Sequence, residues 1–384
     1  MKKNLFRTSI IIFSLLLIAV VLEFAAGIIW KKKYNEFLEG QLHGFDYVDY
    51  ERSIIIPRKN YKATVAKFKD DLTKHKKVLG LRALELSLQE GVHPDSMNLF
   101  IINRHGFKGP EFEIPKPDSI YRILTIGNSC TWGPYNDHYS YPRTIERYLN
   151  DSLNLSNKIE VVNAGVSGYN LERVLKRIKE FLEVEPHLVT IYIGWNRTIG
   201  RADPEKNQYL YRNSDLYKIF YHFFVNQSDT GLDTTFAQKT MYDINDPEME
   251  LYEKYDFDYD IEDLNELVSE IRNYNPEIKI AIITLAGLFD KRITPDQKSL
   301  KIGYPVKSTN NLFAYPVLTA KWNEELKIFA KAKDINIIDF ESEALNLYSS
   351  RSDYYVDSVH FTKIGYFIMG TYFAKQIKNL IELY

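Results

Sequence analysis

Short apolar segments alternate with helical patterns from Tyr121 onwards, and this alternation constrains the fold more than any other feature of the sequence. The segments are rich in Ile and Val and almost continuously apolar, which is typical of parallel strands buried on both faces. They lie at 121–127, 159–165, 188–194, 278–286 and 335–340. Amphipathic helices are expected at 141–152, 171–186, 260–274, 319–333 and 362–382. The pattern predicts an α/β domain in which helices cover both faces of a parallel sheet.

The N-terminus carries an apolar run over residues 10–30, with Glu23 as its only charge. At about 1.5 Å per residue, roughly 20 helical residues cross the hydrocarbon core of a bilayer. A cleaved signal peptide fits less well, because apolar residues continue beyond Ala25 and Ala26. We therefore expect an uncleaved single-pass anchor. Basic residues flank the run on both sides, so its orientation rests on the usual fate of a short basic N-terminus, which places the following domain outside the cytoplasm.

The charge balance and the cysteine and histidine content of the chain bear on which partners and metal sites are expected. Lys and Arg total 49 and Asp and Glu total 51, so the chain has no strong positive field to bind nucleic acid. Cys130 is the single cysteine, which excludes an intrachain disulfide. The 8 histidines are scattered without the spacing of a metal site. We expect no nucleic-acid partner, no metal and no cofactor.

The sequence pattern divides the chain into three parts. Residues 1–33 form the expected anchor, residues 34–118 a stalk and N-terminal extension, and residues 119–384 the α/β domain. Two long, aromatic-rich connections interrupt that domain, at about 198–258 and 287–318. Connections of this length are often lids or binding loops, but they also occur as added packed surface, and the sequence leaves both interpretations open.

Ser129 follows the first predicted strand, in the segment GNSCTWG (127–133). Open α/β sheets bind their ligands at the carboxyl edge of the strands, and glycine permits the tight turn that exposes a side chain there. Taken alone, the segment is more typical of an ordinary strand-to-helix turn than of a catalytic serine.

Two further segments follow the next two predicted strands. The first reads NAGVSG (163–168), and the amide of Gly165 can point into the same crevice without a side chain in the way. The second reads GWNR (194–197), and the side-chain amide of Asn196 can donate to a developing oxyanion. Each of them alone is also compatible with a plain turn or a helix cap.

Asp357 and His360 precede the last predicted helix, in the segment DSVHF. An Asp three residues before a His can orient the imidazole and stabilise its protonated form, and the imidazole can then accept a proton from a serine hydroxyl. A lone His is more often structural. The four segments together favour a catalytic site, because they occur in one order and each lies on the expected side of the sheet.

As a set, the segments resemble the conserved blocks of the SGNH (GDSL-type) hydrolase family over about residues 121–383. GNSCTWG is similar to the family's GDSxTxG, with Asn128 in place of the Asp. Gly165 matches the glycine of the second block, and GWNR is similar to GxND, with Arg197 in place of the Asp. DSVH matches DxxH. The resemblance implies a flavodoxin-like three-layer α/β/α sandwich with a five-stranded parallel sheet.

The resemblance also implies a role for each matching residue. Ser129 would be the nucleophile, His360 the general base and acid, and Asp357 the residue that orients His360. The oxyanion hole would consist of the amides of Ser129 and Gly165 and the side chain of Asn196.

Several residues depart from the family pattern or could mislead. Asn128 replaces a supporting carboxylate that is not part of the triad, so activity should survive. Arg197 places a cation near the hole, where it could attract an anionic substrate or pair with an acidic neighbour. Cys130 is expected to be a small buried filler and not a catalytic thiol. The upstream segment NRHGFKG (103–109) loosely resembles an NxxGFRG element of some bacterial members, and we assign it no chemical role.

We therefore expect a membrane-anchored serine esterase that acts on ester-linked acyl groups of a small molecule or glycan, for example O-acetylated envelope carbohydrate. Two alternatives stay open: an O-acyltransferase on cell-envelope glycan, which needs the same triad, and a non-catalytic anchored binding module. The presence of Ser129, Asp357 and His360 disfavours the module. Asn196 begins a glycosylation triplet, and a glycan there would block the hole, which favours a bacterial origin.

Overall fold

The computed structural model describes residues 2–42, 45–74, 100–133, 136–152, 158–222 and 240–381. The chain forms two compact units. Of the described residues, 2–42, 47–55 and 204–222 form one unit, which we call the anchor unit after the anchor predicted at its N-terminus, and the others form the sheet unit. Residues 204–222 of the first aromatic connection are therefore grouped with the N-terminal helix and not with the sheet.

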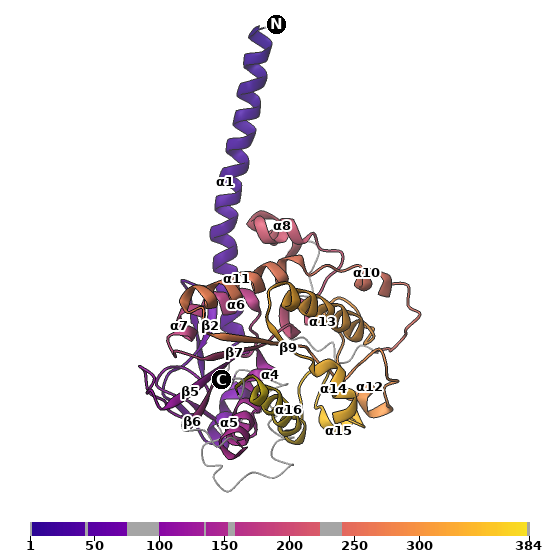
Figure 1. The fold of residues 1–384 in the computed structure, drawn as a ribbon. Coiled ribbons are helices and arrows are strands. Elements are labelled where there is room, and N and C mark those ends of the chain that lie inside the picture. The colour runs from indigo at the N-terminus through magenta and orange to yellow at the C-terminus, as the bar shows by residue number, and fades with distance from the viewer. Residues whose placement is uncertain are drawn as a thin grey trace. The chain divides into compact units, whose positions relative to one another are not determined.

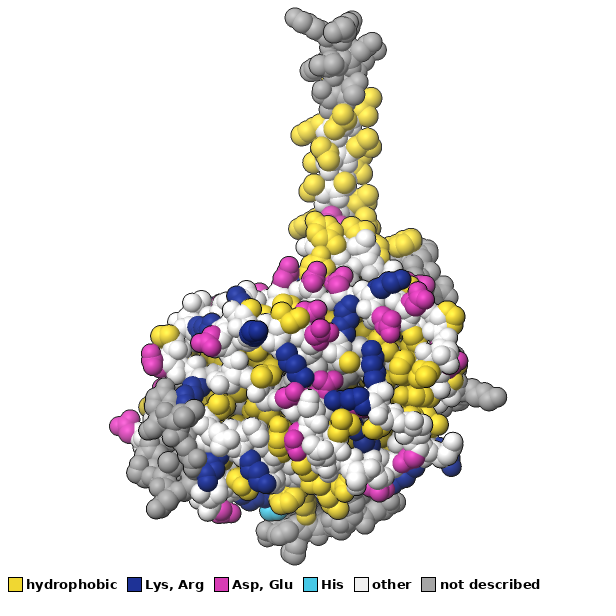
Figure 2. Space-filling model, turned by 45° about the vertical axis from the view of Figure 1, so that its right-hand side comes forward, with side chains coloured by type: hydrophobic (Ala, Val, Ile, Leu, Met, Phe, Trp, Pro, Cys, Tyr) yellow, Lys and Arg dark blue, Asp and Glu magenta, His cyan; other side chains and the backbone are white. Residues whose placement is uncertain are grey.

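Helix α1 (Lys2–Gly40) dominates the anchor unit. Its segment Ile10–Gly40 is long and apolar enough to cross a membrane, with a mean hydropathy of 2.7 and only 6% of its most apolar window buried, although a signal sequence would share these properties. Figure 2 shows hydrophobic side chains around the exposed length of this helix. Its C-terminal end packs through Leu38 against Val48 and Ile55 of a two-stranded sheet, β1 (Asp46–Asp49) with β2 (Ile54–Pro57). The unit also contains α8 (Gln208–Asn213) and α9 (Asp215–Phe220).

Five parallel strands form the centre of the sheet unit, in the spatial order β6-β5-β7-β8-β9. Numbered along the chain this order is 2-1-3-4-5, the doubly wound arrangement of flavodoxin-like folds. The strands are β5 (Ile120–Gly127), β6 (Lys158–Gly165), β7 (Leu188–Tyr192), β8 (Lys279–Ile283) and β9 (Asn336–Ile338). The predicted fold class is confirmed, because each strand overlaps one of the predicted apolar segments.

Helices cover both faces of this sheet (Figure 1). On one face lie α5 (Tyr141–Ser152) and α16 (Lys363–Ile381), which pack against each other. On the other lie α6 (Leu171–Leu175), α7 (Ile178–Leu182), α11 (Asp258–Tyr274) and α13 (Ala314–Ala332). The core between the layers is apolar and aromatic, and its largest fully buried side chains include Trp322, Tyr141 and Phe181.

Shorter elements connect these layers, and several of them carry the candidate site. They are β3 (Tyr61–Ala63), α2 (Val65–Lys74), β4 (Phe100–Ile102), α4 (Ser129–Trp132), a 3-10 turn (Asp137–Tyr139), a π turn (Trp195–Gly200), α10 (Met249–Glu253), α12 (Gln297–Ile302), α14 (Phe340–Leu347) and α15 (Arg351–Tyr354).

Two predicted helices have different limits in the structure. The helix expected over 171–186 is broken into α6 and α7 at Arg177, whose φ of −124° and ψ of 1° are not helical. The Arg177 side chain is buried, bonds Glu180 at 3.0 Å and lies 4.7 Å above the Phe181 ring, and these contacts favour the break. The helix expected from 319 begins at Ala314, because Pro316 is tolerated in a first turn where the amide would have no partner.

Candidate active site

Ser129 is presented by a tight turn at the carboxyl end of the central strand β5. The strand ends at Gly127, and α4 begins at Ser129. The Asn128 Oδ1 accepts a hydrogen bond from the Cys130 amide at 3.0 Å and so caps the helix. An Asn provides the same cap oxygen as an Asp, which explains why Asn128 preserves the local structure. Its Nδ2 is buried without a hydrogen-bond partner among the described residues.

Glycine is required where α4 packs against the strand ends. A Cβ at Gly127 would lie 2.0 Å from the Thr131 Oγ1 and 2.5 Å from the Tyr192 carbonyl oxygen. A Cβ at Gly165 would lie 2.3 Å from the Trp132 amide nitrogen. These distances are shorter than any tolerable contact, so the two glycines keep the serine turn close to the sheet. Their appearance at the ends of two predicted strands was therefore a packing signal as well as a turn signal.

The structure brings together the three residues expected to form a triad, although Ser129 and His360 are 231 positions apart in the chain. The Ser129 Oγ lies 2.8 Å from the His360 Nε2. The His360 Nδ1 lies 2.8 Å from the Asp357 Oδ2 and 3.1 Å from Oδ1. The Asp357 Oδ1 also accepts hydrogen bonds from the amides of Val359 and His360, at 2.9 and 2.8 Å. The carboxylate is thus fixed by its own loop and in turn fixes the imidazole.

The electrostatics of this group suit a serine–histidine proton transfer. Burial alone lowers the pKa of His360, but the charge and hydrogen bond of Asp357 outweigh burial, and the pKa lies above its ordinary value of 6.5. Burial alone raises the pKa of Asp357, but His360 and the two loop amides outweigh it, and the pKa falls below its ordinary value. Asp357 is therefore an anion beside the imidazole, where its charge favours the protonated form of His360.

Hydrogen bonds within the loop and to a second segment fix the loop that carries Asp357 and His360. Tyr355 and Phe361 pair across its base, and the Val356 amide donates to the His360 carbonyl at 2.9 Å. The hydroxyl of Ser358 donates to the Tyr304 carbonyl at 2.7 Å and accepts from the Tyr304 amide at 2.8 Å. The second aromatic connection, 287–318, therefore contributes Tyr304 to the support of this loop.

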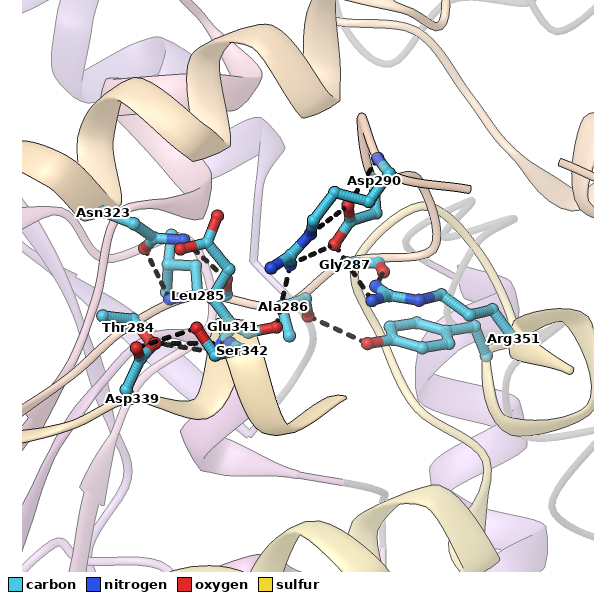
Figure 3. A network of polar contacts seen from close by, with 12 residues as sticks. Thr284, Leu285, Ala286, Gly287, Asp290, Asn323, Asp339, Glu341, Ser342 and Arg351 are labelled. Carbon is cyan, nitrogen blue, oxygen red and sulfur yellow. Dashed lines mark hydrogen bonds and ion pairs between the residues drawn. The ribbon is translucent and has the colours of Figure 1, made fainter. Parts of the chain in front are cut away.

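A polar network fixes the segment that follows β8, which also contacts this loop (Figure 3). Arg351 donates to the Gly287 carbonyl and to the Asp290 carboxylate, the latter at 3.1 Å. The Tyr355 hydroxyl donates to the Ala286 carbonyl at 3.0 Å. The Leu288 amide then donates to the Ser358 carbonyl at 2.9 Å. The hydrogen bond from Leu288 to Ser358 thus connects the buried Arg351–Asp290 ion pair to the segment between Asp357 and His360.

The N–H groups expected in the oxyanion hole differ in whether they already donate to an acceptor within the protein. The Gly165 amide donates to the Asn163 Oδ1 at 2.9 Å. The Asn196 Nδ2 donates to the Tyr169 carbonyl at 2.8 Å, which leaves its second N–H for another acceptor. Within the described parts of the chain, no acceptor faces the Ser129 amide or the Gly168 amide. Gly168 has a φ of +77° and is exposed, one residue before the carbonyl that holds Asn196.

Gly168 is therefore a candidate that the sequence prediction missed. It ends the segment NAGVSG, three residues after Gly165. The available sequence signal was the second glycine itself, because glycine in a short turn often marks a positive φ, and Gly168 has one. The prediction chose the glycine that ends the strand, and the structure shows that this amide already has an acceptor in the side chain of Asn163.

The upstream segment NRHGFKG contacts the short helix α4, which begins at Ser129. Lys108 is buried, and its Nζ donates to the Trp132 carbonyl at 2.9 Å and lies 5.2 Å from the centre of the Trp132 ring. Burial lowers the pKa of Lys108 to about 7, although the charge of Asp137 opposes this shift. The segment to which we assigned no chemical role thus packs against the last residue of α4.

The remaining predictions near the nucleophile have different outcomes. Cys130 is buried, its Sγ contacts the Val359 carbonyl at 3.4 Å, and burial together with the nearby Asp357 charge raises its pKa, so it remains a thiol. The side chain of Arg197 lies outside the described part of the structure. Among the described residues, no cluster of His, Cys, Asp or Glu has the geometry to hold a metal ion.

Comparison with known proteins identifies the family. The GDSL-like lipase/acylhydrolase family matches residues 125–368. The chain belongs to this family. It is therefore an ester-hydrolysing enzyme with the GDSL-hydrolase fold. No curated protein matches the sequence.

Solved structures similar to this GDSL-like hydrolase include two bacterial enzymes. An acetylxylan esterase from Geobacillus stearothermophilus is 15% identical, with a TM-score of 0.41, and the match covers 67% of this chain and 94% of that one. A lipase/acylhydrolase from Enterococcus faecalis is 18% identical, with a TM-score of 0.39, and the match covers 67% of this chain and 96% of that one.

Proposed function

We propose that this GDSL-like hydrolase cleaves ester-linked acyl groups with Ser129 as nucleophile, His360 as general base and acid, and Asp357 as the residue that orients His360. The observation that carries the proposal is the continuous line of contacts from the Ser129 Oγ to the His360 Nε2 and from the His360 Nδ1 to Asp357, each at 2.8 Å. This is the hydrogen-bond reach that a nucleophile, its base and an orienting carboxylate require.

In the first half of the proposed reaction, the Ser129 Oγ attacks the ester carbonyl while the His360 Nε2 accepts the serine proton. The resulting tetrahedral oxyanion collapses, the acyl group stays on Ser129, and His360 gives the proton to the leaving alcohol. In the second half, a water molecule loses a proton to His360 and attacks the acyl-serine. Collapse of the second oxyanion releases the carboxylic acid and returns the proton to Ser129.

The proposed oxyanion hole consists of the amides of Ser129 and Gly168 and the second N–H of Asn196. Gly168 replaces Gly165, because the Gly165 amide already donates to Asn163. Hydrogen-bond donors that are fixed in advance stabilise the charge that develops in the transition state. The bond from Asn196 to the Tyr169 carbonyl holds that side chain in one orientation, next to the turn that carries Gly168.

The proposed substrate is an O-acylated carbohydrate or a small ester at the outer surface of a membrane, with O-acetylated envelope glycan as the first class to test. Helix α1 supports attachment to a membrane, because its apolar segment is long enough to cross a bilayer. The proposed outward position of the following domain rests on the usual fate of a short basic N-terminus before a first apolar run.

Labelling with a serine-directed fluorophosphonate tests the proposed nucleophile. We expect one adduct on Ser129, identified by mass spectrometry of the peptide that contains GNSCTWG, and no adduct after prior heat unfolding. An adduct on another serine, or no adduct on the folded protein, would contradict the proposal. Incubation of the labelled and unlabelled enzyme with acetylated oligosaccharide, with and without a free glycan acceptor, then separates release of acetate from acyl transfer.

Replacement of Asn196 tests the side-chain donor of the hole. Asn196→Ala is expected to lower kcat by about 10²–10³-fold, because one fixed donor to the oxyanion is worth roughly 3 kcal/mol. Asn336→Ala is the matched control, since that side chain also donates to a backbone carbonyl, Ile280, but lies at the start of β9. Equal activity of the two variants in an aryl-ester assay would exclude Asn196 from the hole.

A further inference from the structure

In the anchor unit, the short helices α8 and α9 are tied to the apolar part of α1. The Glu23 Oε2 accepts a hydrogen bond from the Ser214 Oγ at 2.9 Å. Its Oε1 accepts from the backbone amides of Asp215 and Leu216. The single carboxylate of the apolar run thus accepts hydrogen bonds from a segment about 190 positions later in the chain. A carboxylate without such partners would be costly in an apolar surrounding.

The packing beside Glu23 is close because the residues of α1 are small there. Ala26 is only 3% exposed, although Ile28 and Ile29 on the same helix are 61% and 50% exposed. A Cβ at Gly27 would lie 3.0 Å from the Asp215 Oδ2. The start of α9 therefore lies against the level of α1 between Glu23 and Gly27. Trp30 is the last residue of the apolar run. It lies about 10 Å along the helix axis from Glu23, at about 1.5 Å per residue.

Aromatic rings gather around that end of the run. The Trp30 ring stacks on Tyr34 at 5.8 Å and on His222 at 4.9 Å between ring centres. The Tyr211 hydroxyl bonds the His222 Nε2 at 2.9 Å, and the Tyr211 ring lies 5.9 Å from that of Tyr221. Rings of Trp and Tyr, which have an apolar body and a polar edge, are enriched where membrane proteins pass through the lipid headgroups.

The outer surface of α8 and α9 is apolar. Four large apolar or aromatic side chains on these two helices are between 40% and 64% exposed: Tyr209, Leu210, Leu216 and Phe220. They lie on the segment that Glu23 ties to α1, and α9 packs against this exposed apolar helix, so the exposed apolar side chains of both belong to one part of the molecule. A lipid surface is the partner that this continuity favours, because an interfacial helix presents its apolar side chains to the acyl chains next to a membrane-spanning segment.

We propose that residues 207–222 form an interfacial segment, which Glu23 clamps to the membrane helix and which inserts Leu216 and Phe220 into the lipid headgroup layer. The proposal rests on the proposed membrane location of α1, and it adds a second contact with the bilayer. A clamp of this kind would fix the rotation and depth of α1, which a single apolar helix does not do by itself.

Fluorescence quenching in vesicles tests this proposal with the full-length protein. The chain carries an environment-sensitive label at Leu216→Cys or Phe220→Cys and is reconstituted into phosphatidylcholine–phosphatidylglycerol vesicles with bromine on the acyl chain near the headgroup. Ile328→Cys on α13 is the control, because Ile328 is 56% exposed and Phe220 is 50% exposed. Cys130 is buried, so the unmodified chain gives the labelling background.

Labels at positions 216 and 220 are expected to be quenched at least about twofold more than the label at 328, with blue-shifted emission. Glu23→Leu should reduce this quenching toward the control level. Quenching at 216 and 220 no greater than at 328 would overturn the proposal. A separate label at Leu17→Cys, with bromine near the middle of the acyl chain, tests the anchor itself: quenching there without quenching at 216 and 220 would leave the anchor and overturn only the interfacial segment.

Discussion

Ser129→Ala is expected to abolish ester hydrolysis, with a fall in kcat of about 10⁴–10⁶-fold for an aryl acetate. The hydroxyl removed is the group 2.8 Å from the His360 Nε2, and no acyl-enzyme can form without it. The remaining activity would come from the oxyanion hole and from substrate binding, which do not depend on the nucleophile. KM should change little, because the serine oxygen contributes to the transition state more than to substrate binding.

Three measurements make this result specific. Ser269→Ala, which removes an exposed hydroxyl on α11, should keep full activity. His360→Ala should lose about as much activity as Ser129→Ala, and the double variant little more, because members of one catalytic unit are not additive. Thermal unfolding should show that Ser129→Ala remains folded. A folded Ser129→Ala variant with more than a tenth of the wild-type kcat would exclude the assigned nucleophile.

The fold was predictable because its signals are local. Each parallel strand is a short apolar run, and a chain that alternates such runs with amphipathic helices has few ways to bury them. Helix limits were less predictable where tertiary contacts decide them. The sequence around Arg177 has the apolar periodicity of one continuous helix. The break at this residue is explained only by the contacts of its buried side chain with Glu180 and Phe181.

The contact between Ser129, His360 and Asp357 could be predicted from the order of the motifs and their resemblance to the family, but the candidate oxyanion donors could not be ranked in the same way. Gly165 and Gly168 lie in one turn, and which amide is free depends on where the Asn163 side chain points. That orientation is a property of the packed structure. The hydrogen bonds between Glu23 and the segment 214–216 could not be predicted either, because no sequence pattern connects polar residues about 190 positions apart.

The pH dependence of hydrolysis should report the pKa of His360. His360 must be neutral to accept the serine proton, so activity is lost as the pH falls through the pKa of its imidazole. Asp357 holds that pKa above the ordinary 6.5, so the acid limb of kcat/KM for the wild type should have its midpoint above pH 6.5. A midpoint below this value would show that His360 does not experience the charge of Asp357 in the free enzyme.

Asp357→Asn is expected to lower kcat by about 10⁴-fold, because the amide can no longer stabilise the imidazolium and can hold the imidazole in the wrong tautomer. It should also move the acid limb to lower pH. Burial disfavours the charged imidazole, and without the carboxylate nothing in this pair opposes burial, so the pKa of His360 should fall below 6.5. Proton NMR of the imidazole gives this pKa directly, even when activity is too low to titrate.

Asp353→Asn is the matched control for this change. Asp353 lies four residues earlier, on α15, but its side chain is exposed and pairs with Lys298. This variant should keep the wild-type kcat and acid limb. A low-activity Asp357→Asn variant with an unshifted His360 pKa would mean that Asp357 acts only as a scaffold, through its bonds to the amides of Val359 and His360. Loss of activity together with a lowered pKa separates the electrostatic role from that structural one, because a scaffold alone does not change the charge beside the imidazole.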